Sequence, residues 1–414
     1  MRIWGRLVAC PLILASCLGA QTFYNYVGQI ESHSVLLAWG TIVPKGTGNT
    51  IGRDSTPLGK ATVRIADRNI AVADHNWALV EGLTPDTVYP YEIDLDGKKR
   101  GGGQVRTWPE QATHLCFFVI GDFGNGLPAQ YAVAQAMDRE FQRRGQTNCP
   151  VRFVLTVGDN IYGVNLGITI LESGDLDAHW ETKFYKPYQN LLLQVPFMAS
   201  LGNHDGNGNE HRGDLYVYLD NFFFPQNKPA RWYTFTYAGM AQFFALDSTI
   251  NTETGPTSGA GYAPGSPQSK WLSQQLADSK AAWKIPYFHH PIYNAGPGHP
   301  DYYKELKHWV DMFQSAGVKV VFTGHEHNFQ FSNAAETGGI LYVVSGSGGE
   351  LREGDVRRKM AQEHIAGWAA TRQFLSIEIE GAEMRVTPVS PDGFTAVDRD
   401  KRPIPMPITQ HLTN

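Results

Sequence analysis

The chain has 414 residues, of which 42% are hydrophobic and 18% are charged, and its formal net charge at pH 7 is −5. This composition excludes an intrinsically disordered chain, and the length exceeds that of one ordinary domain, so two domains are expected. The small negative charge argues against nucleic acid as a dedicated partner. The densest basic cluster, Lys98–Arg100, follows the turn residues Asp96 and Gly97 and is expected to be the solvated tip of a hairpin.

Residues 1–20 have the pattern of a secretory signal peptide. Arg2 and Arg6 precede an apolar stretch that is too short to span a bilayer, and small residues follow it. A lipid anchor is the alternative, because Leu14–Cys17 resembles a bacterial lipoprotein cleavage box in which Cys17 would carry the lipid. The rest of the chain contains no transmembrane segment, so the mature protein is expected to be secreted, periplasmic or lipid-anchored; its oligomeric state is not predicted.

Two cysteines, Cys116 and Cys149, remain after the leader. An even pair in an oxidising compartment favours one disulfide, and each cysteine lies at or just before the start of an apolar run. Two separate buried thiols are the alternative. Neither cysteine belongs to a CxxC motif, so a thiolate metal site is not expected.

Residues 21–108 are expected to form an all-β sandwich, because short runs rich in Val, Ile, Tyr and Thr alternate with turn clusters. These runs are Phe23–Ile30, Val35–Ile42, Ala61–Ala66, Trp77–Val80, Val88–Leu95 and Gln104–Trp108. Trp39 is a candidate core residue, and Leu83–Tyr89 resembles the segment that leads into the tyrosine corner of fibronectin type III domains. Pro90 must then lie at a strand edge or a bulge, since proline has no N–H for strand pairing.

The segment Trp108–Glu110 predicts a linker, and over residues 113–395 apolar strands alternate with helical stretches. The helices are expected over Pro128–Arg144, His179–Leu193, Pro267–Leu276 and Tyr302–Gln314. This alternation indicates a layered α/β domain, in which ligands bind beyond the carboxyl ends of the strands. The Gly-, Pro- and Ser-rich segment Gly255–Pro267 is expected to be a long loop, either over the site or inert at the surface.

Five polar motifs of this second part each follow an apolar run. The runs are Cys116–Ile120, Val151–Val157, Val195–Leu201, Ile285–Phe288 and Val318–Phe322. The motifs are Gly121–Gly124, Gly158–Tyr162, Gly202–Asp205, His289–Pro291 and Gly324–His327. We expect the strands to end at one edge of a sheet, where Asp122 and Asp159 would repel each other unless a cation lay between them. One motif alone fits an ordinary turn, but the set predicts a site for two metal ions.

The candidate ligands offer oxygen and nitrogen atoms only, and such a set suits iron, zinc or manganese. Asn203 would add an amide oxygen, while His325 and His327 can serve different ions if the loop curls around them. Of the neighbours His289 and His290, one is expected to be a ligand. Asp159 is best placed to bridge two ions about 3.5–4 Å apart.

In their order along the chain and in their residue patterns, the five motifs resemble those of the binuclear metallophosphoesterases. Tyr162, three residues after Asp159, is similar to the tyrosine of the subset called purple acid phosphatases. The resemblance covers about residues 113–350, and the β-sandwich before them matches the plant-like and bacterial members. It implies an α/β fold: a catalytic α/β/β/α sandwich of the calcineurin-like type, preceded by an all-β sandwich like fibronectin type III.

The resemblance also implies roles for single residues. The ligands of an Fe(III) ion would be Asp122, Asp159, Tyr162 and His327. The ligands of a second ion, Fe(II), Zn or Mn, would be Asp159, Asn203, His289 and His325. His289 is preferred to His290 because the family ligand stands two residues before the proline. His204 and His299 would be catalytic residues that contact phosphate or protonate the leaving group, with a plain loop role as the alternative for His299.

The implied activity is that of an exported acid phosphatase, in which a metal-activated water attacks phosphate monoesters of small molecules. A phosphodiesterase or nucleotidase on the same scaffold is the alternative, since substrate choice depends on loops such as Gly255–Pro267. Spacing does not place the outer residues His211, Arg212, Arg352 and His364 relative to the phosphate. A non-catalytic binding or adhesion protein is a further alternative, but the complete set of seven ligands argues against it. A dimetal site beside which Tyr162 is only packed is also compatible with the sequence.

Overall fold

The computed structural model describes residues 22–42, 51–162, 164–165, 170–171, 180–205, 215–249 and 261–412. The predicted signal peptide with Cys17, and the loop from Gly255 up to residue 260, lie outside these residues. Among the described helices, none is long and apolar enough to cross a membrane.

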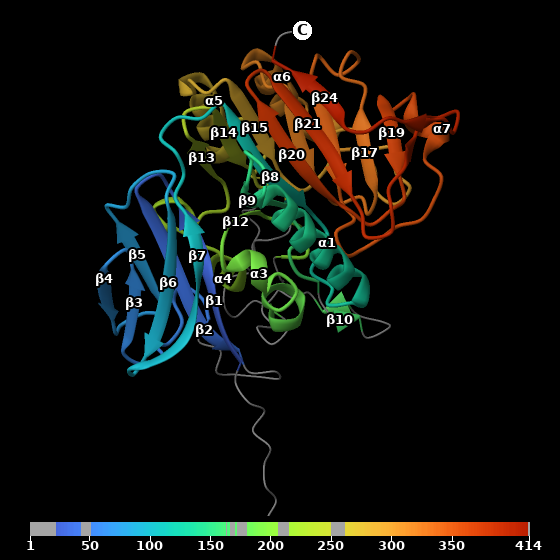
Figure 1. Ribbon diagram of the computed structural model, residues 1–414. Helices are drawn as coiled ribbons and strands as arrows, with labels where there is room; N and C mark the ends of the chain where they lie inside the picture. Colours follow the sequence, from blue (N-terminus) through green and yellow to red (C-terminus); the bar gives the residue numbers. More distant parts are fainter. Residues whose placement is uncertain are drawn as a thin grey trace, which may run out of the picture.

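The N-terminal part is a sandwich of two antiparallel sheets (Figure 1). The first sheet has the order β1-β2-β5, with strands Thr22–Ile30, Ser34–Ile42 and Trp77–Glu81. The second has the order β4-β3-β6-β7, with strands Arg68–Val72, Ala61–Ile65, Val88–Leu95 and Lys98–Arg106. Strand β4 was not predicted, because most of its residues are exposed and its sequence lacks an apolar alternation.

The predicted hairpin tip at Lys98–Arg100 is wrong by a few residues. Asp96 and Gly97 form the turn, and β7 already begins at Lys98, which pairs with Leu95 of β6. Strand β7 therefore spans residues 98–106 instead of 104–108, and the side chains of its first three residues, Lys98 to Arg100, are exposed.

Three other details of the sandwich agree with the sequence expectations. Trp39 is fully buried. The hydroxyl of Tyr89 accepts the backbone N–H of Thr84 at 2.9 Å, which is the contact of a tyrosine corner. Pro90 pairs with Gln104 of β7 but lies one residue beyond the pairing of β6 with β3, so β6 has only one neighbouring strand there among the described residues.

Two larger sheets form the remaining part. One has the order β12-β9-β8-β20-β21-β24, with strands Phe197–Ser200, Val151–Val157, His114–Ile120, Phe374–Glu380, Glu383–Val389 and Ile408–His411. The other has the order β13-β14-β15-β16-β18-β17-β19-β22-β23, with strands Tyr233–Tyr237, Ala241–Ala245, Trp283–Tyr287, Val320–Thr323, Leu341–Ser345, Phe329–Ser332, Ile365–Ala369, Ala396–Val397 and Pro403–Ile404. Sheet pairing thus continues beyond residue 395.

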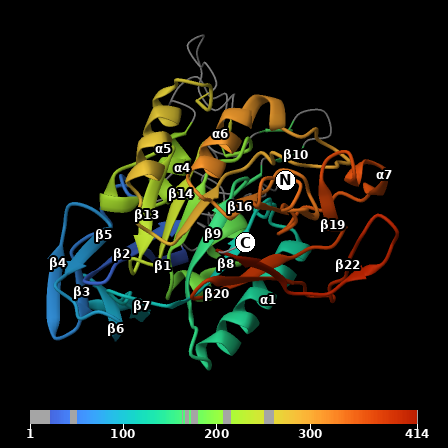
Figure 2. The same ribbon diagram turned by 90° about the horizontal axis from the view of Figure 1, so that it is seen from above.

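These two sheets pack face to face through aromatic side chains. The ring centroid of Phe117 lies 5.3 Å from that of Phe243, and Phe153 lies 5.1 Å from the same ring. Helix α1 (Pro128–Gly145) lies on one side of the sheets, and α5 (Pro267–Asp278) and α6 (Tyr303–Ser315) lie on the other (Figure 2). The layers confirm the expected α/β/β/α sandwich.

The remaining elements are short. They are β10 (Val164–Asn165), β11 (Ile170–Leu171), the π-helical turn η1 (Glu181–Tyr185), α3 (Gln189–Leu192), α4 (Tyr216–Asn221), η2 (Pro225–Asn227) and α7 (Arg357–Met360). The single helix predicted over His179–Leu193 is therefore wrong. Pro187 lies between η1 and α3, and a proline has no N–H with which to continue the helical hydrogen bonds.

The motif strands are divided between the two sheets, contrary to the expectation of one sheet edge. Strands β8, β9 and β12 run parallel in the first sheet, and β15 and β16 run parallel in the second. Face-to-face packing of the sheets places the two groups of strand ends side by side, so the predicted site requires both sheets.

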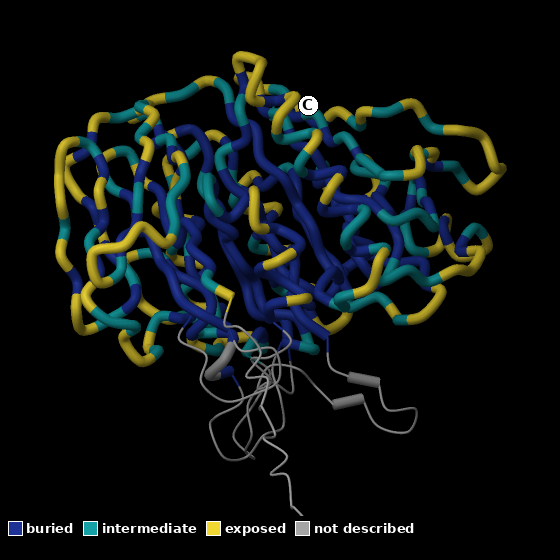
Figure 3. Tube along the Cα trace, turned by 60° about the horizontal axis from the view of Figure 1, so that its bottom comes forward, coloured by how far each residue is buried: buried dark blue, intermediate teal, exposed yellow. Residues whose placement is uncertain are grey.

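Trp108, the first residue of the predicted linker, is a buried contact, whereas Glu110 is exposed. Trp108 is 5% exposed, and its ring lies against Phe153, Phe235 and Tyr237. Buried positions run from the strands of the sandwich into the central sheets (Figure 3). The β-sandwich and the α/β part therefore share one apolar core.

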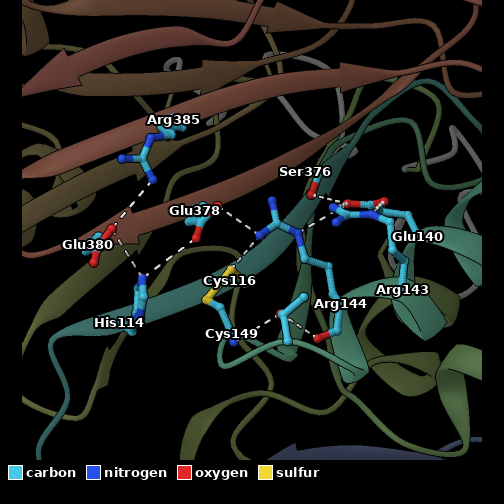
Figure 4. The surroundings of a disulfide bond; sticks show 11 residues. His114, Cys116, Glu140, Arg143, Arg144, Cys149, Ser376, Glu378, Glu380 and Arg385 are labelled. Carbon is cyan, nitrogen blue, oxygen red and sulfur yellow. Dashed lines mark hydrogen bonds and ion pairs between the residues drawn. A yellow bond between two sulfur atoms is a disulfide. The ribbon is translucent and has the colours of Figure 1, made fainter.

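The two mature cysteines form a disulfide between Cys116 of β8 and Cys149, just before β9 (Figure 4). This bond confirms the predicted disulfide and excludes the alternative of two separate buried thiols. Nη1 of Arg144, near the end of α1, lies 3.5 Å from Sγ of Cys116 and 2.9 Å from Oε2 of Glu378. The disulfide and the ion pair together join α1, β8, β9 and β20 at the end of the sheet that is opposite to the motifs.

Candidate metal centre

The motif residues leave their strands through sharp turns. Asp122 and Asp159 directly follow the glycines after β8 and β9, and both have positive φ angles, 55° and 49°. His325, just after β16, has a φ of 69°. Such angles are unfavourable for side chains with a Cβ and are retained where the surroundings impose them, commonly at functional sites.

One group of donors, the phenol cluster, consists of Asp122, Tyr162 and His327. The Tyr162 hydroxyl donates to Oδ1 of Asp122 at 3.1 Å and lies 3.2 Å from Nε2 of His327. The same His327 nitrogen lies 3.4 Å from Oδ1 of Asp122. One potential ligand atom of Asp159 lies within 4.8 Å of those of Asp122 and His327.

A second group, the imidazole cluster, consists of Asn203, His289 and His325. Nε2 of His289 lies 3.0 Å from Oδ1 of Asn203, 3.2 Å from Nδ1 of His325 and 3.3 Å from Oδ2 of Asp159. Nδ1–H of His289 donates to the carbonyl of Val157 at 2.8 Å, an orientation that leaves Nε2 free to bind an ion. Asp159 therefore borders both clusters.

The electrostatics of the two clusters fit cations. Burial raises the pKa of Asp122 above its usual range. Burial would lower the pKa of His289, but the carboxylates of Asp159 and Asp122 raise it to about 9. Burial, together with the charges of Asp122 and Asp159, raises the pKa of Tyr162 well above its usual value. Buried carboxylates beside imidazole and phenol groups are the O and N donors that iron, zinc or manganese bind.

Asp205 holds two of the motifs together. One carboxylate oxygen accepts the backbone N–H of Asn160 at 2.8 Å, and the other accepts the backbone N–H of Gly202 at 2.7 Å and the side-chain amide of Asn160 at 2.7 Å. Burial and the charge of Asp159 raise the pKa of Asp205 to about 8. Sequence reasoning gave Asp205 no role, because its partners are brought to it by the pairing of β9 with β12.

The two predicted catalytic histidines contact different members of the donor set. The backbone N–H of His204 donates to Oδ1 of Asp159 at 2.9 Å, and the ring centroid of His204 lies 4.7 Å from that of Tyr162. The half-buried ring of His299 lies 4.0 Å from the ring of His325. His290 instead has its Nδ1 2.9 Å from Oγ of Ser248.

Of the outer residues that spacing did not place, His211 and Arg212 lie outside the described residues, and Arg352 lies at this centre. Its backbone N–H donates to the carbonyl of His327 at 2.8 Å, and its guanidinium pairs with Glu326 at 3.0 Å. His364 pairs with exposed Glu336 in a turn after β17. The contacts of Arg352 join residues 25 or more positions apart along the chain, so spacing gave no signal for them.

Comparison with known proteins agrees with this fold. The family described as Calcineurin-like phosphoesterase matches residues 117–329. Purple acid phosphatase 3 of Arabidopsis thaliana is 27% identical over 288 residues, 66% of this chain and 73% of that protein. Tartrate-resistant acid phosphatase type 5 of Oryctolagus cuniculus is 24% identical over 306 residues, 69% of this chain and 90% of that protein.

Two solved structures resemble the whole chain in fold. PhoD has a TM-score of 0.64 at 14% identity, covering 92% of this chain and 91% of that one. A purple acid phosphatase from yellow lupin seeds has a TM-score of 0.61 at 14% identity, covering 94% of this chain and 74% of that one. Since the family match spans more than half of the sequence and includes both sheets, the chain belongs to the calcineurin-like phosphoesterase family.

Proposed function

We propose that this protein is an exported acid phosphatase that hydrolyses phosphate monoesters of small molecules at a centre of two metal ions. The observation that carries the proposal is the position of Asp159, whose carboxylate borders both the phenol cluster and the imidazole cluster. A carboxylate in that position can bridge two ions. Export is supported by the leader-like residues 1–20 and by the Cys116–Cys149 disulfide, a bond typical of oxidising compartments. Residues 21–108 and 113–395 are the two domains of this proposal, and strands β22, β23 and β24 after residue 395 complete the sheets of the second.

The two clusters suit different ions. The phenol cluster, with Asp159, would hold Fe(III), because two carboxylates and a phenol form an oxygen-rich set for a highly charged ion. The imidazole cluster, with Asp159, would hold Fe(II), Zn or Mn through nitrogen and amide oxygen atoms. When bound, two such ions would neutralise the phosphate charge and lower the pKa of a water molecule, which would then lose a proton and become a nucleophile for phosphorus.

Hydrogen bonds within the protein orient the candidate ligands. The Val157 carbonyl fixes the ring of His289, and Asp205 holds the turns that carry Asp159 and Asn203. His204 lies against Tyr162 and His299 against His325. Each would hydrogen-bond a phosphate oxygen or give a proton to the leaving alkoxide.

Replacement of the bridging carboxylate tests the proposal. In Asp159→Ala we expect both ions and the hydrolysis of a monoester such as p-nitrophenyl phosphate to be lost, as measured by metal analysis and a colorimetric assay. Asp311→Ala is the matched control, because Asp311 is exposed on α6 and pairs only with Lys307 among the described residues. An Asp159→Ala protein with its metal content and activity intact would refute the proposal. A diester cleaved faster than the monoester would assign the protein to the phosphodiesterases instead.

Visible absorption tests the role of Tyr162. A phenolate bound to Fe(III) gives a charge-transfer band, so the oxidised, iron-loaded protein should be coloured and Tyr162→Phe should lose the colour. Tyr188→Phe is the matched control, since Tyr188 is also buried and its hydroxyl accepts a hydrogen bond from Gln130, outside the site. A colourless wild-type protein with oxidised iron bound would exclude Tyr162 as a ligand.

A further inference from the structure

Glu326 stands between two candidate ligands in the sequence, but its carboxylate contacts other groups. The side chain is fully buried. Oε2 accepts the backbone N–H of Gly298 at 3.1 Å and that of His299 at 2.7 Å, and Oε1 accepts Nη1 of Arg352 at 3.0 Å. Both oxygens are thus engaged, and the carboxylate joins a loop to a cation.

The residues that follow contact the same loop. Nδ2 of Asn328 and Nε2 of Gln330 donate to the carbonyl of Gly296 at 3.1 and 2.9 Å, and Oε1 of Gln330 accepts the N–H of Ala295 at 3.0 Å. Both side chains are fully buried. Residues 325–328 form a bend. From it the side chains of positions 326 and 328, with that of position 330 in β17, hold the loop 294–299, while positions 325 and 327 belong to the two donor clusters.

The loop carries His299 to the edge of the donor set, where its ring packs on His325. Arg352 packs on the same loop, because a Cβ on Gly298 would overlap its guanidinium. A fully buried carboxylate is costly unless it is paired and hydrogen-bonded. The buried charge of Glu326 is offset by its ion pair with Arg352 and by hydrogen bonds from the backbone N–H groups of residues 298 and 299, at the loop that carries His299.

We propose that Glu326 is a positioning residue, which fixes His299 beside the metal site through the backbone of residues 298–299, with Arg352 as its countercharge. The inference rests on the proposed function, in which His299 contacts the phosphate or the leaving group. Proton donation needs the donor within about 3 Å of its acceptor, so a loop that is free to move would place His299 correctly for less of the time.

Glu326→Gln tests the proposal with little change of volume. The amide keeps one acceptor oxygen but presents a donor to Arg352, so the ion pair is lost and the bonds to the loop weaken. We expect kcat to fall about tenfold and KM to change less than about twofold, because the ions and not His299 would hold the phosphate. Metal content should be unchanged. Glu336→Gln, at an exposed glutamate paired with His364, is the matched control and should leave kcat unaltered.

A double-mutant cycle shows whether Glu326 acts through His299. His299→Ala alone should lower kcat by about 100-fold, the usual contribution of a proton donor. In that background Glu326→Gln should change kcat by less than about twofold, because the group that it positions is gone. Equal losses in both backgrounds, or loss of metal in Glu326→Gln, would overturn the proposal.

Amide hydrogen exchange over residues 294–300 separates this inference from the proposed function. The N–H groups of Gly298 and His299 should exchange about tenfold faster in Glu326→Gln, and faster still in Glu326→Ala, with the increase confined to this loop. Unchanged exchange in both variants, or an increase spread over the chain, would overturn the anchoring. If the wild-type protein hydrolyses no phosphoester, the proposed function fails, while exchange still decides whether Glu326 anchors the loop.

Discussion

Replacement of Trp108 by alanine measures how strongly the β-sandwich and the α/β part stabilise each other. The ring of Trp108 is buried at 5.4 Å from Tyr237, 5.7 Å from Phe153 and 6.1 Å from Phe235, measured between centroids. An aromatic side chain of this kind buries about 150–250 Å². At about 25 cal/mol per Å², that area is worth about 4–6 kcal/mol. Because unfolded chains already bury part of it, we expect Trp108→Ala to lower the free energy of unfolding by about 3–5 kcal/mol.

Urea unfolding followed by far-ultraviolet circular dichroism measures this loss without relying on tryptophan fluorescence. The wild-type protein should unfold in one transition, because the two parts share a core. In Trp108→Ala the midpoint should fall and the transition should broaden or divide. Trp108→Phe, the control, keeps an aromatic ring and should lose less than half as much. A loss below about 1 kcal/mol in Trp108→Ala would refute the idea that this contact couples the two parts.

Two further predictions concern charges and the disulfide. Burial would raise the pKa of Asp86, but the neighbouring Arg106 and Arg152 outweigh burial and hold that pKa below its usual range. The ionised Asp86 carboxylate therefore stabilises the fold above about pH 4, and this stabilisation is lost as the pH falls through the depressed pKa. The melting temperature of wild type should therefore exceed that of Asp86→Asn at pH 7 and approach it near pH 2; a constant difference would contradict this. Reduction of the Cys116–Cys149 disulfide, which closes a sequence separation of 33 residues, should lower the free energy of unfolding by about 3–4 kcal/mol in urea titrations with and without reductant. Equal stabilities would contradict it.

Most of the secondary structure was predictable because its signals are local. Strand β9 occupies the run Val151–Val157 as predicted, since a short, mostly apolar run bounded by proline and glycine has few alternatives to a buried strand. Strand β4 was missed because an exposed strand of mixed composition lacks such a signal. The prediction of one helix over His179–Leu193 did not take account of Pro187. Proline interrupts helical hydrogen bonding locally, so this break was predictable from the sequence.

The candidate site was likewise predictable only in part. Every predicted ligand lies in a short motif directly after a strand, and the structure brings all seven together with His204 and His299. The functions of Glu326 and Asp205 were not predictable. Each carboxylate bonds to groups 26 or more residues away, apart from the Gly202 contact of Asp205, and a sequence motif records no such partner.

The sequence by itself determined which residue types stand at the ends of which strands, because strand periodicity and turn chemistry depend on neighbours a few residues apart. Only the tertiary structure decided that the strands belong to two sheets, that Cys116 pairs with Cys149, and that Glu326 contacts the loop 294–299. These outcomes depend on which segments pack together. That packing is decided by the burial of the whole apolar surface, to which no single motif contributes more than a small part.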